Sequence, residues 1–194
     1  MPVEKMQHRV LIVSGTDKVY DYFTDILPKK EFYPLLRATS AGEAKRILVS
    51  TPVDILIINT PLSDDFGIDL ALDSSDSSMG ILVIVKNEVF DQVSSDLEDS
   101  GILTIKRPNS KQTFYGAIKL LAATHIRLNK FEKKIQILQE KMNDIRTVNR
   151  AKWLLIDALK MTEDEAHYYI EKQAMDSRLS RREVAENIIR TYNK

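Results

Sequence analysis

Apolar residues in the first part of the chain fall into five short runs, which alternate with amphipathic stretches. The runs lie at residues 8–13, 32–37, 54–58, 80–85 and 101–105. A strand that is covered on both faces needs an apolar run of this kind, and strands that alternate with helical stretches form parallel sheets. The pattern therefore predicts an α/β domain over residues 1–118, with a doubly wound sheet of five parallel strands.

The next stretch has a different period, because its apolar residues recur every seven positions in two registers. Such heptads, with charged and polar residues between them, are typical of helices that form coiled coils. We predict a dimerisation helix over residues 119–148 and a homodimer. The predicted interface, called the heptad seam below, consists of Leu121, Leu128, Phe131, Ile135, Leu138, Met142 and Ile145. The alternative is a single long helix that packs on its own domain.

The last part of the chain contains three amphipathic segments. After Ile145 the heptads widen into the apolar stripe of a helix that faces a globular core. Two further helices are predicted to begin at capping boxes, one at Thr162 to Glu165 and one at Ser180 to Glu183. None of the three can bury its stripe alone, so residues 149–194 are predicted to form an all-α three-helix bundle, continuous with the coiled coil.

Composition argues against catalysis. The chain has no cysteine, and its three histidines, His8, His125 and His167, are scattered along the sequence. We therefore interpret each histidine as a packing or surface residue and expect no catalytic residue, no metal site, no cofactor and no enzyme activity. The chain has no apolar run of roughly 18 residues and no signal peptide at its start. These features predict a cytoplasmic protein without a membrane partner.

The formal net charge of zero conceals an uneven distribution. Residues 1–118 contain 12 Lys and Arg against 17 Asp and Glu, whereas residues 119–194 contain 16 against 11. A basic carboxy-terminal half favours a polyanionic partner. The excess in the predicted bundle is small, with nine basic against eight acidic residues in 149–194. The placement of the charges must therefore matter more than their sum.

The ends of the predicted strands carry a resemblance to a known family. The run from Asp54 to Asn59, Gly67 after it, and Arg107 followed by Pro108 resemble a response-regulator receiver domain, whose fold is flavodoxin-like. In that family an aspartate ends the third strand and accepts phosphate, an acidic pair follows the first strand, Thr or Ser ends the fourth, and Lys precedes the proline. The corresponding degenerate phosphoacceptor site here consists of Ser14, Gly15, Asn59, Lys86 and Arg107.

The resemblance therefore implies a pseudo-receiver. An amide cannot form an acyl phosphate, and a site without carboxylates offers Mg²⁺ almost no ligands. Asp64 and Asp65 in the following loop are alternative acceptors, although a solvated acidic loop is the simpler interpretation. We expect the domain to sense a regulatory protein or a small ligand by binding it, or only to dimerise.

The bundle closely resembles the ANTAR domain, an RNA-binding antiterminator module. The matching residues are Ala151, Lys152, Leu155, Glu165, Ala166, Ala174, Met175, Asp176, Ser180, Glu183, Val184, Ala185, Ile188 and Ile189. Trp153 departs from the family, which commonly has Gly there, and we interpret the indole as a packing residue, with a platform on which RNA bases stack as the alternative. A receiver-like domain in front is the usual arrangement in this family.

This resemblance implies a regulator that binds stem-loops in a nascent leader transcript and prevents transcription termination. The candidate RNA-binding residues are Arg150, Lys152, Lys172, Gln173, Arg178, Arg181 and Arg182. Two alternatives remain open. Three small helices can also place a recognition helix in the major groove of DNA, and the bundle of a signalling adaptor would bind a protein instead.

Overall fold

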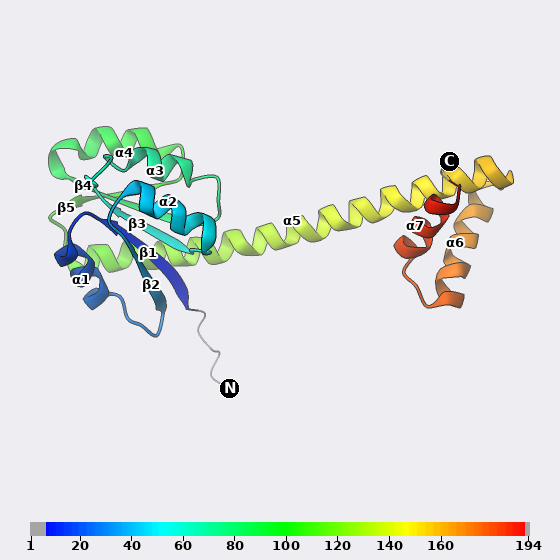
Figure 1. The fold of residues 1–194 in the computed structure, drawn as a ribbon, viewed down its shortest axis with the longest axis horizontal. Coiled ribbons are helices and arrows are strands. Elements are labelled where there is room, and N and C mark those ends of the chain that lie inside the picture. Colours follow the sequence, from blue (N-terminus) through cyan, green and yellow to red (C-terminus); the bar gives the residue numbers. More distant parts are fainter. Residues whose placement is uncertain (1–6, 193–194) are drawn as a thin grey trace. The chain divides into compact units, whose positions relative to one another are not determined.

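The computed structural model describes residues 7–192. The chain divides into two compact units, Met1–Lys130 and Phe131–Lys194. The helix α5 (Lys111–Leu159) begins in the first unit and ends in the second without a break (Figure 1).

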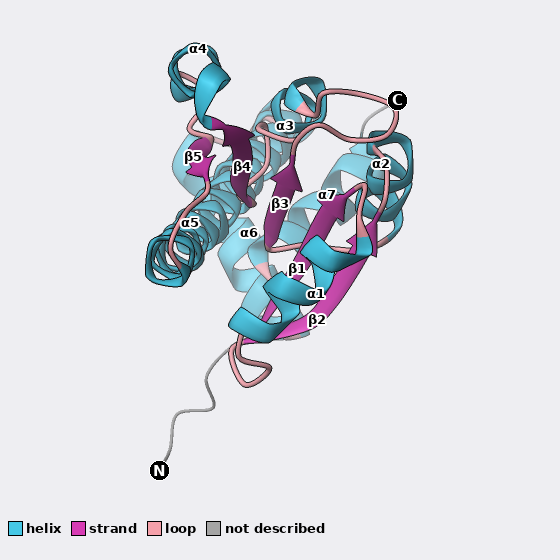
Figure 2. Cartoon of the chain, turned by 90° about the vertical axis from the view of Figure 1, so that its left-hand side faces the viewer, coloured by secondary structure: helices cyan, strands magenta, loops and turns pink. Residues whose placement is uncertain are grey.

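The first unit is built on a five-stranded parallel sheet, seen in Figure 2. Its strands are β1 (His8–Ser14), β2 (Phe32–Ala38), β3 (Ile55–Asn59), β4 (Gly80–Lys86) and β5 (Leu103–Arg107). Their order is β2-β1-β3-β4-β5, and every pair is parallel. The predicted flavodoxin-like sheet is confirmed, and each strand lies within two residues of its predicted run.

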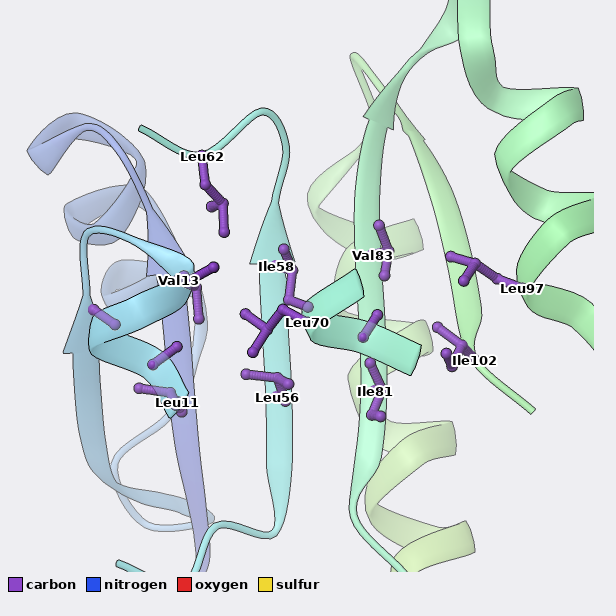
Figure 3. Packing of buried hydrophobic residues seen from close by; sticks show 14 of the residues in the cluster. Leu11, Val13, Leu56, Ile58, Leu62, Leu70, Ile81, Val83, Leu97 and Ile102 are labelled. Carbon is purple, nitrogen blue, oxygen red and sulfur yellow. The ribbon is translucent and has the colours of Figure 1, made fainter. Parts of the chain in front are cut away.

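Helices cover both faces of this sheet, which explains why the strands are apolar throughout. The helices are α1 (Asp17–Ile26), α2 (Ala41–Ser50), α3 (Ile68–Asp73) and α4 (Phe90–Glu98), with a short 3₁₀ turn (Asn87–Val89) before α4. Alternate residues of each strand enter opposite cores: Leu56 and Ile58 pack with residues of α2, α3 and α4 (Figure 3). Ile55 and Ile57 pack instead with residues of α1 and the start of α5.

The first turns of α5 belong to the core of the first unit. Phe114 stacks on Phe23 of α1 with ring centroids 4.6 Å apart. Leu121 lies so close to β4 that a Cβ added to Gly80 would be only 2.9 Å from the Cβ of Leu121. Leu121 is therefore 6% exposed. The heptad spacing predicts Leu121 as part of the heptad seam, but its side chain is buried against the sheet of its own domain.

The second unit contains the end of α5, α6 (Glu163–Ser177) and α7 (Arg181–Tyr192). Its small core consists of Ala151, Leu155, Ala166, Ile170, Val184, Ala185 and Ile188. Both predicted capping boxes form: Thr162 and Glu165 exchange hydrogen bonds at the start of α6, and Ser180 and Glu183 do so before α7. The predicted carboxy-terminal helices are confirmed. None of the helices in residues 7–192 is long and apolar enough to cross a membrane.

Candidate nucleic-acid interface

A hollow of about 530 Å³ lies in the surface of the second unit, between α5 and the starts of α6 and α7. This bundle hollow is lined by Lys141, Asp144, Ile145, Val148, Asn149, Lys152, His167, Ser180, Arg181 and Arg182. It brings together three of the candidate RNA-binding residues, Lys152 from α5 and Arg181 and Arg182 from the first turn of α7. Apolar side chains of α5 form part of its wall, so the hollow offers both cationic and apolar contacts.

The three candidate RNA-binding residues of the bundle hollow are already paired with carboxylates. Lys152 Nζ lies 3.0 Å from Glu163 Oε1, and Arg181 Nη2 lies 2.9 Å from Glu171 Oε1. The ammonium group of Lys152 is the main reason why the pKa of Glu163 lies below its usual value. A phosphate that enters the hollow must therefore compete with these carboxylates. The side chain of Arg181 is 62% exposed, and ion pairs at such exposed positions are weak, so an exchange of its partner is inexpensive.

Arg182 makes the most extensive of these contacts. Its Nη1 donates to Asp144 Oδ1 at 2.9 Å, and its Nε donates to Glu186 Oε1 at the same distance. Asp144 lies on α5 and Glu186 on α7, so the guanidinium links two helices of the bundle. About half of the Arg182 side chain remains exposed.

The other candidate RNA-binding residues lie elsewhere on the unit. Gln173 lines a smaller depression of about 230 Å³, together with Asn187. Arg178 ends α6 in a left-handed conformation, and Lys172 and Arg150 are exposed. The structure therefore gathers Lys152, Arg181 and Arg182 at one site and separates Gln173 from them.

Trp153 follows Lys152 on α5 and is 70% exposed. The predicted packing role is wrong, because the buried stripe of this helix passes through Ala151 and Leu155 and leaves position 153 on the outer face. An exposed indole next to a lysine is a surface on which an unpaired base can stack.

Six residues of the heptad seam form a row of exposed apolar side chains along α5. They are Leu128, Phe131, Ile135, Leu138, Met142 and Ile145, and each is at least 42% exposed. Large apolar side chains at heptad spacing on one helix are unusual on a solvated surface and typical of an interface. Ile145 also lines the bundle hollow, so the row reaches the candidate RNA site.

The degenerate phosphoacceptor site is closed by hydrogen bonds. Asn59 ends β3 opposite Ser14 of β1, and its Nδ2 lies 3.5 Å from Ser14 Oγ. Arg107, at the end of β5, donates from Nη1 to Asn59 Oδ1 at 3.2 Å and from Nη2 to the carbonyl oxygen of Thr60 at 2.6 Å. Gly15 and Lys86 flank this cluster and are exposed. The side chains that meet at this point are an amide, a hydroxyl and a guanidinium.

Asp64 has a structural role that sequence reasoning missed. Its carboxylate accepts hydrogen bonds from the backbone N–H groups of Ala41 and Gly42, at 2.8 and 3.0 Å, at the start of α2. The hydrogen bond from Gly42 is the largest cause that lowers the pKa of Asp64, and the bond from Ala41 is the second. Asp65 accepts from the backbone of Gly67 at 2.7 Å. The loop is therefore held by its aspartates, which argues against a merely solvated acidic loop.

A third cluster unites residues far apart in the sequence. His8 begins β1, Asp54 precedes β3 and His125 lies on α5, and their ligand atoms all lie within 4.8 Å of one another. Burial is the largest cause that lowers the pKa of His8. His8 and His125 are far apart in the sequence and both are buried, as a packing role predicts, but the fold also brings them together with Asp54. The spacing of the three residues contains no signal for this contact, because it depends on how α5 packs across the sheet.

Comparisons with known proteins agree with this division. Residues 136–189 match the family model of the ANTAR domain. The transcriptional regulatory protein PdtaR of Mycobacterium tuberculosis is 24% identical over 184 residues, which cover 94% of this chain and 90% of that protein.

Solved structures resemble the first unit. A signal receiver domain from Pseudomonas fluorescens superposes with a TM-score of 0.58 and 16% identity, covering 67% of this chain and 98% of that one. A CheY-like receiver domain protein from Methanospirillum hungatei gives a TM-score of 0.56 and 19% identity over 63% of this chain and 98% of that one. At these identities the similarity establishes the receiver fold alone.

Proposed function

We propose that this chain, which carries a receiver-like domain followed by an ANTAR domain, is a dimeric RNA-binding regulator that prevents transcription termination. The ANTAR domain would bind stem-loops of a nascent leader transcript in the cytoplasm, so that a terminator hairpin does not form. The single observation that carries the proposal is the convergence of Lys152, Arg181 and Arg182 on one hollow within the matched domain.

The chemistry of the bundle hollow suits a structured RNA loop. Guanidinium and ammonium groups hold phosphates, and apolar walls with a nearby exposed indole accept unstacked bases. Asn149, which also lines the hollow, offers an amide that can pair with a base edge. A duplex would present phosphates but no splayed bases, so the site favours a loop over a regular helix.

The test compares two arginines of α7. Arg182→Gln removes a cation of the bundle hollow, whereas Arg190→Gln removes the same charge elsewhere on the helix; both side chains pair with Glu186. We expect Arg182→Gln to weaken hairpin binding roughly tenfold, the value of a charge-assisted hydrogen bond, and Arg190→Gln to change it less than twofold. Both titrations use one salt concentration, because salt alone shifts such affinities.

A competition assay separates the alternatives. A DNA-binding regulator predicts that duplex DNA displaces the RNA hairpin at equal concentration, and an adaptor predicts no salt-dependent binding to either nucleic acid. Equal effects of Arg182→Gln and Arg190→Gln would also refute the assignment of the hollow, because net charge alone would then explain binding.

The exposed heptad seam supports a homodimer. A second copy of α5 would cover the row from Leu128 to Ile145, and two bundles would then engage two hairpins at once. The second contact becomes intramolecular, which raises the affinity for a two-hairpin RNA on the order of 100-fold without a large positive charge on the domain. This gain suits a domain whose net charge is close to zero.

The dimer is tested by placing Lys at both Ile135 and Leu138. Because both side chains are more than half exposed in the single chain, the double variant should fold normally yet sediment as a monomer. It should bind a single hairpin as the parent protein does and lose the gain on a two-hairpin RNA. The proposed interface is wrong if sedimentation shows an unchanged dimer.

The receiver-like domain would detect its signal without being phosphorylated. The closed cluster of Asn59, Ser14 and Arg107 offers no nucleophilic carboxylate. We propose that a regulatory protein or small ligand supplies the signal to this unit instead.

A further inference from the structure

The cluster of His8, Asp54 and His125 lies at the amino ends of β1 and β3, away from the phosphoacceptor position at their carboxy ends. Both imidazoles are 5% exposed, and the side chain of Asp54 is 24% exposed. The three groups are therefore enclosed, with the carboxylate as the part that water reaches. Two imidazoles and one carboxylate form a ligand set that transition metals commonly use.

The distance within the cluster fits a tetrahedral cation. Nε2 of His125 lies 3.2 Å from Oδ1 of Asp54. Two ligands at 2.0–2.1 Å from a tetrahedral Zn²⁺ are separated by about 3.3 Å, so these two atoms already stand at the required spacing. A ring nitrogen of His8 lies within 4.8 Å of both and must approach by at most about 1.5 Å, a shift that imidazole rotation can supply.

The surrounding hydrogen bonds orient the two ligands. Nδ1 of His125 lies 2.8 Å from the carbonyl oxygen of Ser78 and donates to it, which directs the lone pair of Nε2 toward Asp54. The other oxygen of Asp54 accepts from the backbone N–H of Arg9 at 2.8 Å. Such outer contacts are characteristic of metal-binding histidines and carboxylates. In this tautomer Nε2 accepts from the amide of Asn129 and also lies 3.2 Å from the carboxylate oxygen of Asp54, an approach of two acceptors that a cation between them would make favourable.

Two further atoms bear on the site. Nδ1 of His8 is buried without a hydrogen-bond partner, so its ring is held by packing rather than by polar contacts. The amide of Asn129 lies 2.8 Å from Nε2 of His125 and would turn aside when a cation binds. Its oxygen accepts from Ser78 Oγ at 3.2 Å, a contact that would also be exchanged.

We propose that His8, Asp54 and His125 bind a divalent transition-metal cation of the Zn²⁺ class, with water as the fourth ligand. Imidazole nitrogen favours Zn²⁺ and its neighbours in the series, whereas Mg²⁺ and Ca²⁺ require oxygen ligands. One ligand comes from β1, one from the residue before β3 and one from α5, so the cation ties α5 to the sheet. The site offers the first unit an input that needs no phosphorylation.

Zinc binding is measured on the full chain after treatment with a chelator. Isothermal titration should show one Zn²⁺ per chain, and Co²⁺ should give the intense visible bands of a tetrahedral site. His125→Gln and Asp54→Asn should each lower Zn²⁺ affinity on the order of 100-fold, at least as much as loss of an outer contact does. A tenfold excess of Mg²⁺ should not displace the zinc.

The third histidine supplies the matched control. His167 lies on α6, is half exposed and pairs with Glu171, so His167→Gln should leave zinc affinity unchanged. If His125→Gln does not fold, Asp54→Asn still tests the zinc site, because its amide keeps the size of the carboxylate and can accept a hydrogen bond from the backbone N–H of Arg9. Absence of stoichiometric Zn²⁺ binding would show that the contact is only a histidine–aspartate ion pair. Equal affinity in Asp54→Asn and the parent protein would also overturn the site.

Amide hydrogen exchange tests whether the cation links α5 to the sheet. Zn²⁺ should slow amide hydrogen exchange in the part of α5 that follows Ile118 and leave α6 unchanged, because only the former is cross-linked. The Asp54→Asn variant should show no such protection. Binding without protection would refute the role of the cation in fixing α5.

Discussion

Arg107 in the first unit and Arg182 in the second each donate two hydrogen bonds from a guanidinium group, but to different partners. Arg107 bonds to a side-chain amide and a backbone carbonyl, on residues that are 8% and 1% exposed. Arg182 bonds to Asp144 and Glu186, whose side chains are 46% and 38% exposed. The first arginine holds neutral, buried acceptors, and the second holds charged acceptors in contact with water.

This difference decides which site can receive a ligand. A ligand that displaced Arg107 would leave Asn59 and Thr60 with unsatisfied acceptors inside the fold, which is costly. A phosphate that displaced Asp144 from Arg182 would replace one anion by another while water solvates the released carboxylate. The receiver-like site has therefore become part of the structure, whereas the bundle hollow keeps exchangeable contacts.

The largest expected effect is on stability, and it should separate the two arginines. Arg107→Met keeps most of the side-chain volume but removes both donors, so the free energy of unfolding should fall by about 1–3 kcal/mol. Denaturant titration measures this change. RNA affinity of the folded variant should stay at the parent value, because Arg107 is not part of the bundle.

Arg182→Met is the matched variant for that experiment. Since its partners are exposed and remain solvated, the free energy of unfolding should not change measurably, while hairpin binding should weaken. A loss of stability equal to that of Arg107→Met would mean that the link between α5 and α7 is structural. The contrast between the two sites would then be wrong.

A smaller effect is expected from the carboxylates of the bundle hollow. Glu163→Gln should free Lys152 and tighten hairpin binding by about two- to fivefold, the value of a weak ion pair, because the Glu163 side chain is 75% exposed. Because Lys152 lowers the pKa of Glu163, this carboxylate stays ionised at neutral pH and protonates only in acid. The gain should therefore be present at neutral pH and shrink as the pH falls through that lowered pKa. Unchanged affinity at neutral pH would mean that Lys152 does not contact the RNA.

Most of the fold could be predicted from the sequence because the signals are local. Continuous apolar runs identified the five strands, and the capping boxes at Thr162 and Ser180 identified the starts of α6 and α7. The degenerate acceptor position was equally predictable from the sequence, because parallel strands place Ser14 and Asn59 side by side when their carboxy ends align.

The remaining features depend on packing between distant segments. Leu121 satisfies the heptad spacing, yet the contact with Gly80 buries it in the first unit. The meeting of His8 with His125 depends on the same crossing of α5 over the sheet. Trp153 was misjudged for a different reason: a large aromatic residue is usually buried, but its helical position points outward here. Periodicity identifies the buried face of a helix but not the neighbour that it meets.

The smallest expected effect is that of a phosphodonor, which should leave the protein unmodified. Acetyl phosphate with Mg²⁺ should add no acid-stable or hydroxylamine-labile phosphate by intact mass, because Asn59 has no carboxylate and the backbone of Ala41 and Gly42 already bonds both oxygens of Asp64. Asn59→Asp should also stay unmodified, since Ser14 and Gly15 leave no acidic pair to hold Mg²⁺. If only that variant became phosphorylated, Asn59 alone would be the reason why the parent protein is not. Stoichiometric phosphate on Asp64 or Asp65 of the parent protein would contradict the closed receiver site.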